Sequence, residues 1–229
     1  MARHLDVCRQ KTLLAARDEQ PQQKTSTFHL LIEASHQPCY WFHLEVMVEA
    51  TLAVLDQFLR DIWLECCGHL SVFKIGDIRY CEDDELFGDS IWGSRQQPLH
   101  IALDRVLAPG QTCSYEYDFG STTELTLKVL ARYEDKAQHK AIHILARNIL
   151  PSILCDQCDN PAIGACPAYA SEDIDVDDED VDMDIDMVYL CATCAEAHPC
   201  GNRLRPLRQI NSPRAGVCGY TGPTNPAYF

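Results

Sequence analysis

Seven cysteines and one histidine lie between Cys155 and Cys218 in this 229-residue chain, at spacings typical of metal ligands. Cys155-x2-Cys158 and Cys191-x2-Cys194 are each the kind of pair that a tight turn aims at one point. Two such pairs fill the four positions around a tetrahedral ion, so we expect these four thiolates to bind one structural Zn²⁺. Buried free thiols or a redox pair are the alternative, and the coincidence of two pairs in one segment disfavours it.

Four further side chains in the same segment would complete a second four-coordinate zinc ion: Cys166, His198, Cys200 and Cys218. These four residues contain no Cys-x2-Cys pair, because Tyr169 occupies the position where a partner for Cys166 would stand. For these cysteines, ligation and ordinary burial remain open alternatives. We therefore expect one Zn²⁺ or two, in closed sites without a water position.

The cysteines outside this segment have no ligand spacing, and we expect them to be small buried apolar side chains. They are Cys8, Cys39, Cys66, Cys67, Cys81 and Cys113. His69 likewise has no spaced partner and is given no role. The chain contains no phosphate-binding loop, dinucleotide fingerprint, GxSxG or HExxH, so no small-molecule cofactor is expected.

The net charge of −15 is concentrated in one run. Between Glu172 and Asp186 there are ten acidic residues and no basic one, and we expect a solvated acidic loop over residues 171–187. The remainder carries about −5, which argues against non-specific nucleic-acid binding. The one cationic cluster is near the end of the chain: Arg203, Arg205, Arg208 and Arg214.

The beginning of the chain predicts a reducing compartment. Residues 1–23 are polar and contain no apolar signal region, and no apolar run in the chain is long enough to cross a bilayer. We therefore expect a cytoplasmic protein without a membrane partner, in which paired cysteines are metal ligands rather than disulfides.

The elements that must position these residues follow an α+β order. Residues 1–27 predict a poorly ordered lead-in, residues 28–150 one α+β domain, and residues 151–229 a small zinc-ribbon or treble-clef-like module. Strands are expected over 28–33 and 40–48, followed by a helix from the N-cap Thr51 through Trp63 that ends at Gly68. Hairpins are expected around Gly76-Asp77 and over 114–133. Residues 82–97 predict a loop, and the Gly- and Pro-rich residues 211–229 an irregular tail.

Several strings are similar to a known family. HLSVFKIGDIRY (69–80) and LAPGQTCSYEYDFG (107–120) resemble the plasmid Ri ORF-three-like family, whose members are also described as insertion-element passenger, TnpR-like proteins. ARNILPSILCDQC, LCATCAEAHPC and NSPRAGVCGYTG resemble a cysteine-rich zinc-binding extension carried by some members. The resemblance implies a curved antiparallel sheet packed on one main helix, and no catalytic residues. After YDFG the chain departs from the family: Ser121 to Leu125 replace the usual Asp, aromatic residue and His.

Three functional hypotheses follow. The first is a non-enzymatic binding or adaptor protein that presents its zinc module to another macromolecule, protein or nucleic acid. The second is nucleic-acid recognition linked to a mobile element, through the four arginines beside the zinc. The third is a zinc hydrolase with Glu116 or Asp118 as general base, which requires a zinc with an exchangeable water.

Overall fold

The computed structural model describes residues 4–5, 24–82, 95–136, 140–167, 187–199, 204–207 and 210–223. The chain divides into two compact units. Unit 1 comprises Met1–Ile149 and Ile210–Phe229, and unit 2 comprises Leu150–Gln209. The second unit begins at Leu150, and the described residues 210–223 belong to unit 1, whereas the sequence predicted one cysteine module over residues 151–229. The acidic run 172–186 and most of the expected lead-in lie outside the described residues.

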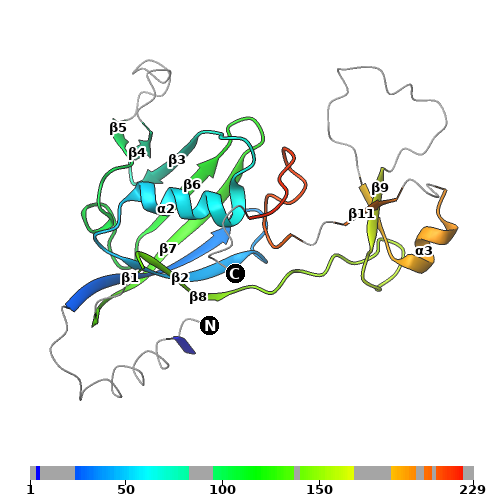
Figure 1. The fold of residues 1–229 in the computed structure, drawn as a ribbon, viewed down its shortest axis with the longest axis horizontal. Helices are drawn as coiled ribbons and strands as arrows, with labels where there is room; N and C mark the ends of the chain where they lie inside the picture. Colours follow the sequence, from blue (N-terminus) through cyan, green and yellow to red (C-terminus); the bar gives the residue numbers. More distant parts are fainter. Residues whose placement is uncertain are drawn as a thin grey trace. The chain divides into compact units, whose positions relative to one another are not determined.

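Unit 1 is built on an eight-stranded sheet in the order β5-β4-β3-β6-β7-β1-β2-β8 (Figure 1). Neighbouring strands are antiparallel, except that β4 and β5 are parallel. The bounds are β1 Lys24–Ala34, β2 Trp41–Met47, β3 Ser71–Ile75, β4 Ile78–Cys81, β5 Arg95–Pro98, β6 Thr112–Tyr117, β7 Thr123–Lys136 and β8 Ile142–Arg147. The expected antiparallel α+β fold is confirmed. The strand β5 was not expected, because its sequence RQQP has no apolar alternation.

One main helix covers a face of this sheet (Figure 1). Helix α2 spans Leu52–Leu59 and continues into the π-helical turn η2, Arg60–Leu64; a short 3-10 helix, η4, follows at Leu103–Arg105. Thr51 caps α2, since its hydroxyl accepts a hydrogen bond from Val54 N. The apolar side of the helix packs on alternate residues of β1 and β2: the rings of Phe42 and Trp63 lie 4.2 Å apart between centroids.

The returning segment, residues 210–223, has no regular structure but is fixed to unit 1 by side-chain hydrogen bonds. Trp63 Nε1 donates to the Asn211 carbonyl at 2.9 Å, and Ser212 Oγ donates to the Trp63 carbonyl at 2.6 Å. Asn148 Nδ2 donates to Asn211 Oδ1 at 2.7 Å, and Asn211 Nδ2 donates back to the Asn148 carbonyl at 3.0 Å. The chain thus leaves unit 1 just after Asn148 and returns to it beside the same residue.

Unit 2 contains a small antiparallel sheet in the order β10-β9-β11. Its elements are β9 Gly164–Pro167, β10 Met187–Leu190, helix α3 Ala192–Ala197 and β11 Arg205–Pro206. Gly164 permits the close approach of β11, because a Cβ at this position would lie 2.9 Å from the Arg205 carbonyl oxygen. Within the described part of the chain, the helices lack the length and apolar character that a bilayer crossing needs.

Candidate metal centres

Unit 2 brings together the two Cys-x2-Cys pairs. The ligand atoms of Cys155, Cys158, Cys191 and Cys194 all lie within 4.8 Å of one another. Cys158 Sγ is 3.6 Å from Cys191 Sγ and 3.7 Å from Cys194 Sγ. A tetrahedral ion with Zn–S bonds of about 2.3 Å would hold its sulfurs about 3.7–3.8 Å apart. The arrangement can therefore accept such an ion with little movement.

Local backbone structure aims the four sulfurs. Cys155 and Cys158 lie in a tight turn closed by a hydrogen bond from Cys158 N to the Cys155 carbonyl at 3.3 Å. Cys191 is the N-cap of α3, where its sulfur accepts a hydrogen bond from Cys194 N at 3.5 Å. One pair is thus held by a turn and the other by the first turn of a helix, which is the kind of geometry that the spacing predicts.

The crowding of these thiols perturbs their ionisation. Burial alone would raise the pKa of Cys155, but backbone hydrogen bonds at Cys191, Gln157 and Cys158 lower it to about 6. Hydrogen bonds with Cys191 and Cys158 raise the pKa of Cys194 to about 12. Neighbouring thiolates repel one another, so this group cannot ionise fully without a counter-charge. A divalent cation would supply that charge.

Of the second set expected from sequence, Cys166 and His198 lie together among the described residues, and Cys218 lies in the other unit. Cys166 is fully buried and its sulfur lies 3.7 Å from His198 Nδ1. Cys200 lies outside the described residues. Cys218 belongs to unit 1, where other side chains surround it. The physical reason is the return of residues 210–223 to the first unit.

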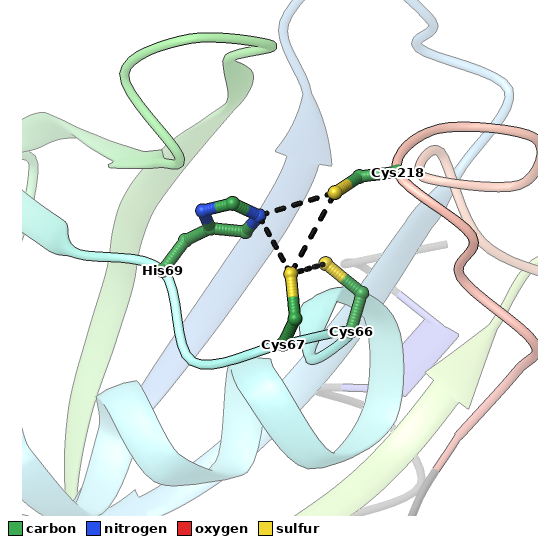
Figure 2. Close-up of side chains that lie close together, drawn as sticks. All are labelled: Cys66, Cys67, His69 and Cys218. Atoms are coloured by element: carbon green, nitrogen blue, oxygen red, sulfur yellow. Dashed lines mark hydrogen bonds between the residues drawn. The ribbon is translucent and has the colours of Figure 1, made fainter.

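Unit 1 contains the second group of ligand atoms, at the C-terminal end of the main helix (Figure 2). Cys66, Cys67, His69 and Cys218 place three sulfurs and one imidazole nitrogen within 4.8 Å of one another. Cys67 Sγ is 3.6 Å from both Cys66 Sγ and Cys218 Sγ. His69 Nε2 is 3.0 Å from Cys67 Sγ and 3.2 Å from Cys218 Sγ. We call these four residues the unit 1 cluster.

The spacing of Cys66, Cys67 and His69 in the sequence did not identify them as members of a metal site. Cys67 is exposed and Cys66 partly so, whereas both were expected to be buried apolar residues. The run Cys66-Cys67-x-His69 lacks the two-residue gap of a knuckle, and Cys218 follows Cys67 by 151 residues. The available signal was the concentration of three ligand-type residues within four positions directly after a helix.

An arginine side chain adjoins the unit 1 cluster. Burial alone would raise the pKa of the Cys66 thiol, but a hydrogen bond from Arg214 Nη2 at 3.5 Å lowers it. Hydrogen bonds with Cys218 and Cys66 raise the pKa of Cys67 to about 12. As in unit 2, the protein environment stabilises one thiolate while the neighbouring sulfurs oppose ionisation of the next.

Arg214 is not a surface cation, contrary to its place in the expected arginine cluster. Its side chain is fully buried, and Nη2 donates to Asp118 Oδ2 at 2.6 Å. Arg205 is exposed on β11 of unit 2, while Arg203 and Arg208 lie outside the described residues. The cluster of four positive charges that sequence proximity suggested is therefore not formed as a set.

The two carboxylates considered as general bases are both ion-paired. Glu116 pairs with Lys74 on the adjacent strand β3. Asp118 accepts hydrogen bonds from Arg214 and from the backbone N–H groups of Gly120 and Ser121. Burial alone would raise the pKa of Asp118, but these hydrogen bonds lower it. A carboxylate held in this way is a poor proton acceptor near neutral pH.

Comparison with known proteins gives a family but no activity. Residues 26–152 match the family model described as "Plasmid pRiA4b ORF-3-like protein". A search of curated proteins found no match. The crystal structure of a protein of unknown function from Methanosarcina mazei Go1 is similar, with a TM-score of 0.47 and 14% sequence identity, over 54% of this chain and 70% of that chain.

Proposed function

This chain belongs to the plasmid pRiA4b ORF-3-like family, and from that premise we propose that it is a non-enzymatic zinc-binding protein whose unit 2 is an adaptor module for a protein partner. The observation that carries the zinc assignment is the convergence of four sulfurs at near-tetrahedral separations in unit 2. Thiolates in a tetrahedral set select zinc over harder divalent cations.

A structural role for this zinc is supported by its ligand count. The protein supplies all four ligands, so the ion has no open position for water or substrate. The small sheet of unit 2 is short, and its apolar cluster is made largely of the cysteines themselves. A unit of this size gains much of its folding free energy from the metal.

The surface of unit 2 favours a protein partner over nucleic acid. Leu154 and Ile163 are each 52% exposed, and Ile153 is 40% exposed, on segments joined by the bridge from Leu154 to Pro161. Exposed apolar side chains beside a rigid site favour a protein interface. The nucleic-acid alternative loses Arg214, which faces the interior of unit 1.

Metal analysis tests the zinc assignment. The full chain, purified under reducing conditions without chelator, is expected to contain zinc, and the Cys155→Ser/Cys158→Ser variant to contain one ion fewer. Cys39→Ser is the matched control, because Cys39 is exposed and belongs to neither group of ligands. An unchanged zinc content in the double variant would refute the site.

Cobalt substitution tests the structural role. Co²⁺ in a closed four-thiolate site keeps its visible spectrum when azide is added, whereas an open position binds azide and the bands shift. We expect no shift from the unit 2 site. A shift, or a hydrolytic activity abolished by a single substitution at Glu116 or Asp118, would overturn the non-enzymatic role.

A further inference from the structure

The unit 1 cluster has the dimensions of a metal site. Cys67 Sγ lies 3.6 Å from both Cys66 Sγ and Cys218 Sγ, close to the roughly 3.7–3.8 Å edge that tetrahedral Zn–S bonds impose. For one sulfur and one imidazole nitrogen the corresponding edge is about 3.5 Å. His69 Nε2 lies 3.0 and 3.2 Å from two sulfurs, so an outward shift of a few tenths of an ångström would complete the geometry.

The loop that carries Cys67 and His69 is fixed by its surroundings. Gly68 adopts a φ of +78°, which turns the chain so that the residues on either side converge. Its N–H donates to Glu65 Oε1 at 2.5 Å. His69 N donates to Tyr117 Oη at 3.3 Å, and the His69 carbonyl accepts from Arg60 Nη1 at 2.7 Å. The His69 ring also stands edge-on to the Tyr117 ring, 5.8 Å away between centroids.

Cys218 is held in an unfavourable backbone conformation. Its φ is +46° and that of Gly219 is +67°, and Tyr220 N donates to the Val217 carbonyl at 2.9 Å. Positive φ at both corner residues is the pattern of a type I′ turn, where Gly, Asn or Asp is usual. A cysteine there is strained, and the turn directs its thiol at the other three ligands (Figure 2).

The charge around the cluster also suits a metal. Zn²⁺ with three thiolates and a neutral imidazole carries one net negative charge, which a neighbouring cation would stabilise. Arg214 is fully buried, and its Nη2 lies 3.5 Å from Cys66 Sγ. Its Nη1 is fixed by the Ser121 carbonyl and Thr123 Oγ1, each at 3.0 Å. A guanidinium therefore lies beside the cluster, and it also pairs with Asp118, whose Oδ2 is 3.4 Å from His69 Nε2.

From these contacts we propose that Cys66, Cys67, His69 and Cys218 form a second structural Zn²⁺ centre that fastens the returning segment, residues 210–223, to the end of the main helix. Three ligands come from the loop after η2 and the fourth from a turn 149–152 positions further along the chain. The ion joins two parts of unit 1 that are otherwise held by hydrogen bonds and packing.

A disulfide between neighbouring thiols is the competing state. Cys66, Cys67 and Cys218 are thiols in the structure, and the separations of 3.6 Å from Cys67 Sγ to the other two sulfurs exceed the roughly 2.05 Å of an S–S bond. Intact mass under non-reducing conditions distinguishes the two states, since a cystine lowers the mass by two hydrogens. Finding that loss in zinc-supplied, freshly purified protein, mapped to Cys66–Cys67 or Cys67–Cys218, would overturn the proposal.

Zinc stoichiometry of four full-length proteins locates each ion. We expect two zinc ions in the parent chain and in Cys39→Ser, one for each group of ligands. One ion should remain in Cys66→Ser/Cys218→Ser and one in Cys155→Ser/Cys158→Ser. If only the latter variant loses zinc, the unit 2 site stands and the unit 1 centre is refuted. If only Cys66→Ser/Cys218→Ser loses zinc, the unit 1 centre stands and the unit 2 site is refuted.

Cys218→Gly tests whether Cys218 is a zinc ligand in a variant that is expected to remain folded. Glycine adopts positive φ without strain, so in excess chelator the variant should melt at the parent temperature or above it. Added Zn²⁺ should raise the melting temperature of unit 1 in the parent chain but not in the variant. An equal rise in both proteins would show that Cys218 is not a ligand and would overturn the proposal.

Discussion

Replacing Arg214 with methionine is expected to destabilise unit 1 more than any other single arginine substitution among its described residues. The guanidinium is fully buried and pairs with Asp118, whose side chain is 7% exposed. Methionine has a similar length and fills much of the space, so the main loss is electrostatic. Asp118 would keep its hydrogen bonds from Gly120 N and Ser121 N through Oδ1, while Oδ2 would lose the guanidinium and keep only His69 Nε2, 3.4 Å away.

The magnitude follows from the burial of the pair. Removing one partner of a buried ion pair costs about 3–5 kcal/mol, because the other charge is left uncompensated. In a unit of this size each kcal/mol shifts the melting temperature by about 2–4 °C, so the decrease should be roughly 6–20 °C. Arg105→Met is the matched control: this side chain is 77% exposed, and its loss should change stability by less than about 0.5 kcal/mol.

Chemical unfolding with excess chelator and reductant is the appropriate assay, because it removes any contribution from zinc. Asp118→Asn completes a double-mutant cycle, and asparagine tolerates the φ of 65° at this position. The double variant should be less destabilised than the sum of the singles, by up to about 3 kcal/mol. A loss below about 1 kcal/mol for Arg214→Met, or simple additivity with Asp118→Asn, would refute the argument.

Four further outcomes are expected. Thr51→Ala should lower the unfolding free energy by about 1 kcal/mol through loss of the cap on Val54 N, with Thr51→Ser near the parent value in denaturant titrations. The pKa of Asp118 is lower in the folded state than in the unfolded state. The contribution of this carboxylate to stability should therefore be constant above about pH 4 and fall as the pH drops through the folded-state pKa. Asp118→Asn should flatten this acid limb of the stability–pH curve. Gly164→Ala should clash with β11 and weaken zinc retention by unit 2 in chelator competition, roughly 5- to 150-fold for a cost of 1–3 kcal/mol, and an unchanged affinity would show that the strand can move away. Replacing residues 150–209 with a short Gly-Ser linker should leave unit 1 folded by circular dichroism and thermal melting, and a chain that no longer unfolds cooperatively would contradict the observed division.

Features encoded by neighbouring residues could be predicted from the sequence. The apolar spacing from Leu52 to Trp63 predicted the main helix, and the alternation after Ser114 predicted the hairpin of β6 and β7. The Cys-x2-Cys spacing likewise predicted the four cysteines whose sulfurs converge in unit 2. In each case the signal spans a few turns or strand residues, so backbone geometry alone links sequence to structure.

Features that depend on distant partners could not be predicted. The parallel pairing of β5 with β4 joins a polar strand to the strand before it across residues 82–94, and neither sequence carries a pattern that specifies the register. The tail was expected to be irregular, and its backbone has no regular secondary structure in the described residues. Its position is set by hydrogen bonds such as Ser212 Oγ to the Trp63 carbonyl, and no periodicity encodes such bonds. Cys218 was therefore assigned to the nearer cysteines in sequence rather than to Cys67.

Unit 2 lies between the two segments of unit 1 in the sequence, so it is an insertion in that unit. The two ends of unit 1 that flank it are joined by reciprocal hydrogen bonds between Asn148 and Asn211, so unit 1 is closed where unit 2 departs. The family match ends at residue 152, whereas Arg214 and Cys218 lie beyond it. The match alone therefore does not account for the unit 1 cluster, which requires the returning segment as well. A chain that presents a module between two such anchored ends can vary the module while its own core and ion pair remain intact, because the core cluster and the Arg214–Asp118 pair are formed by residues of unit 1.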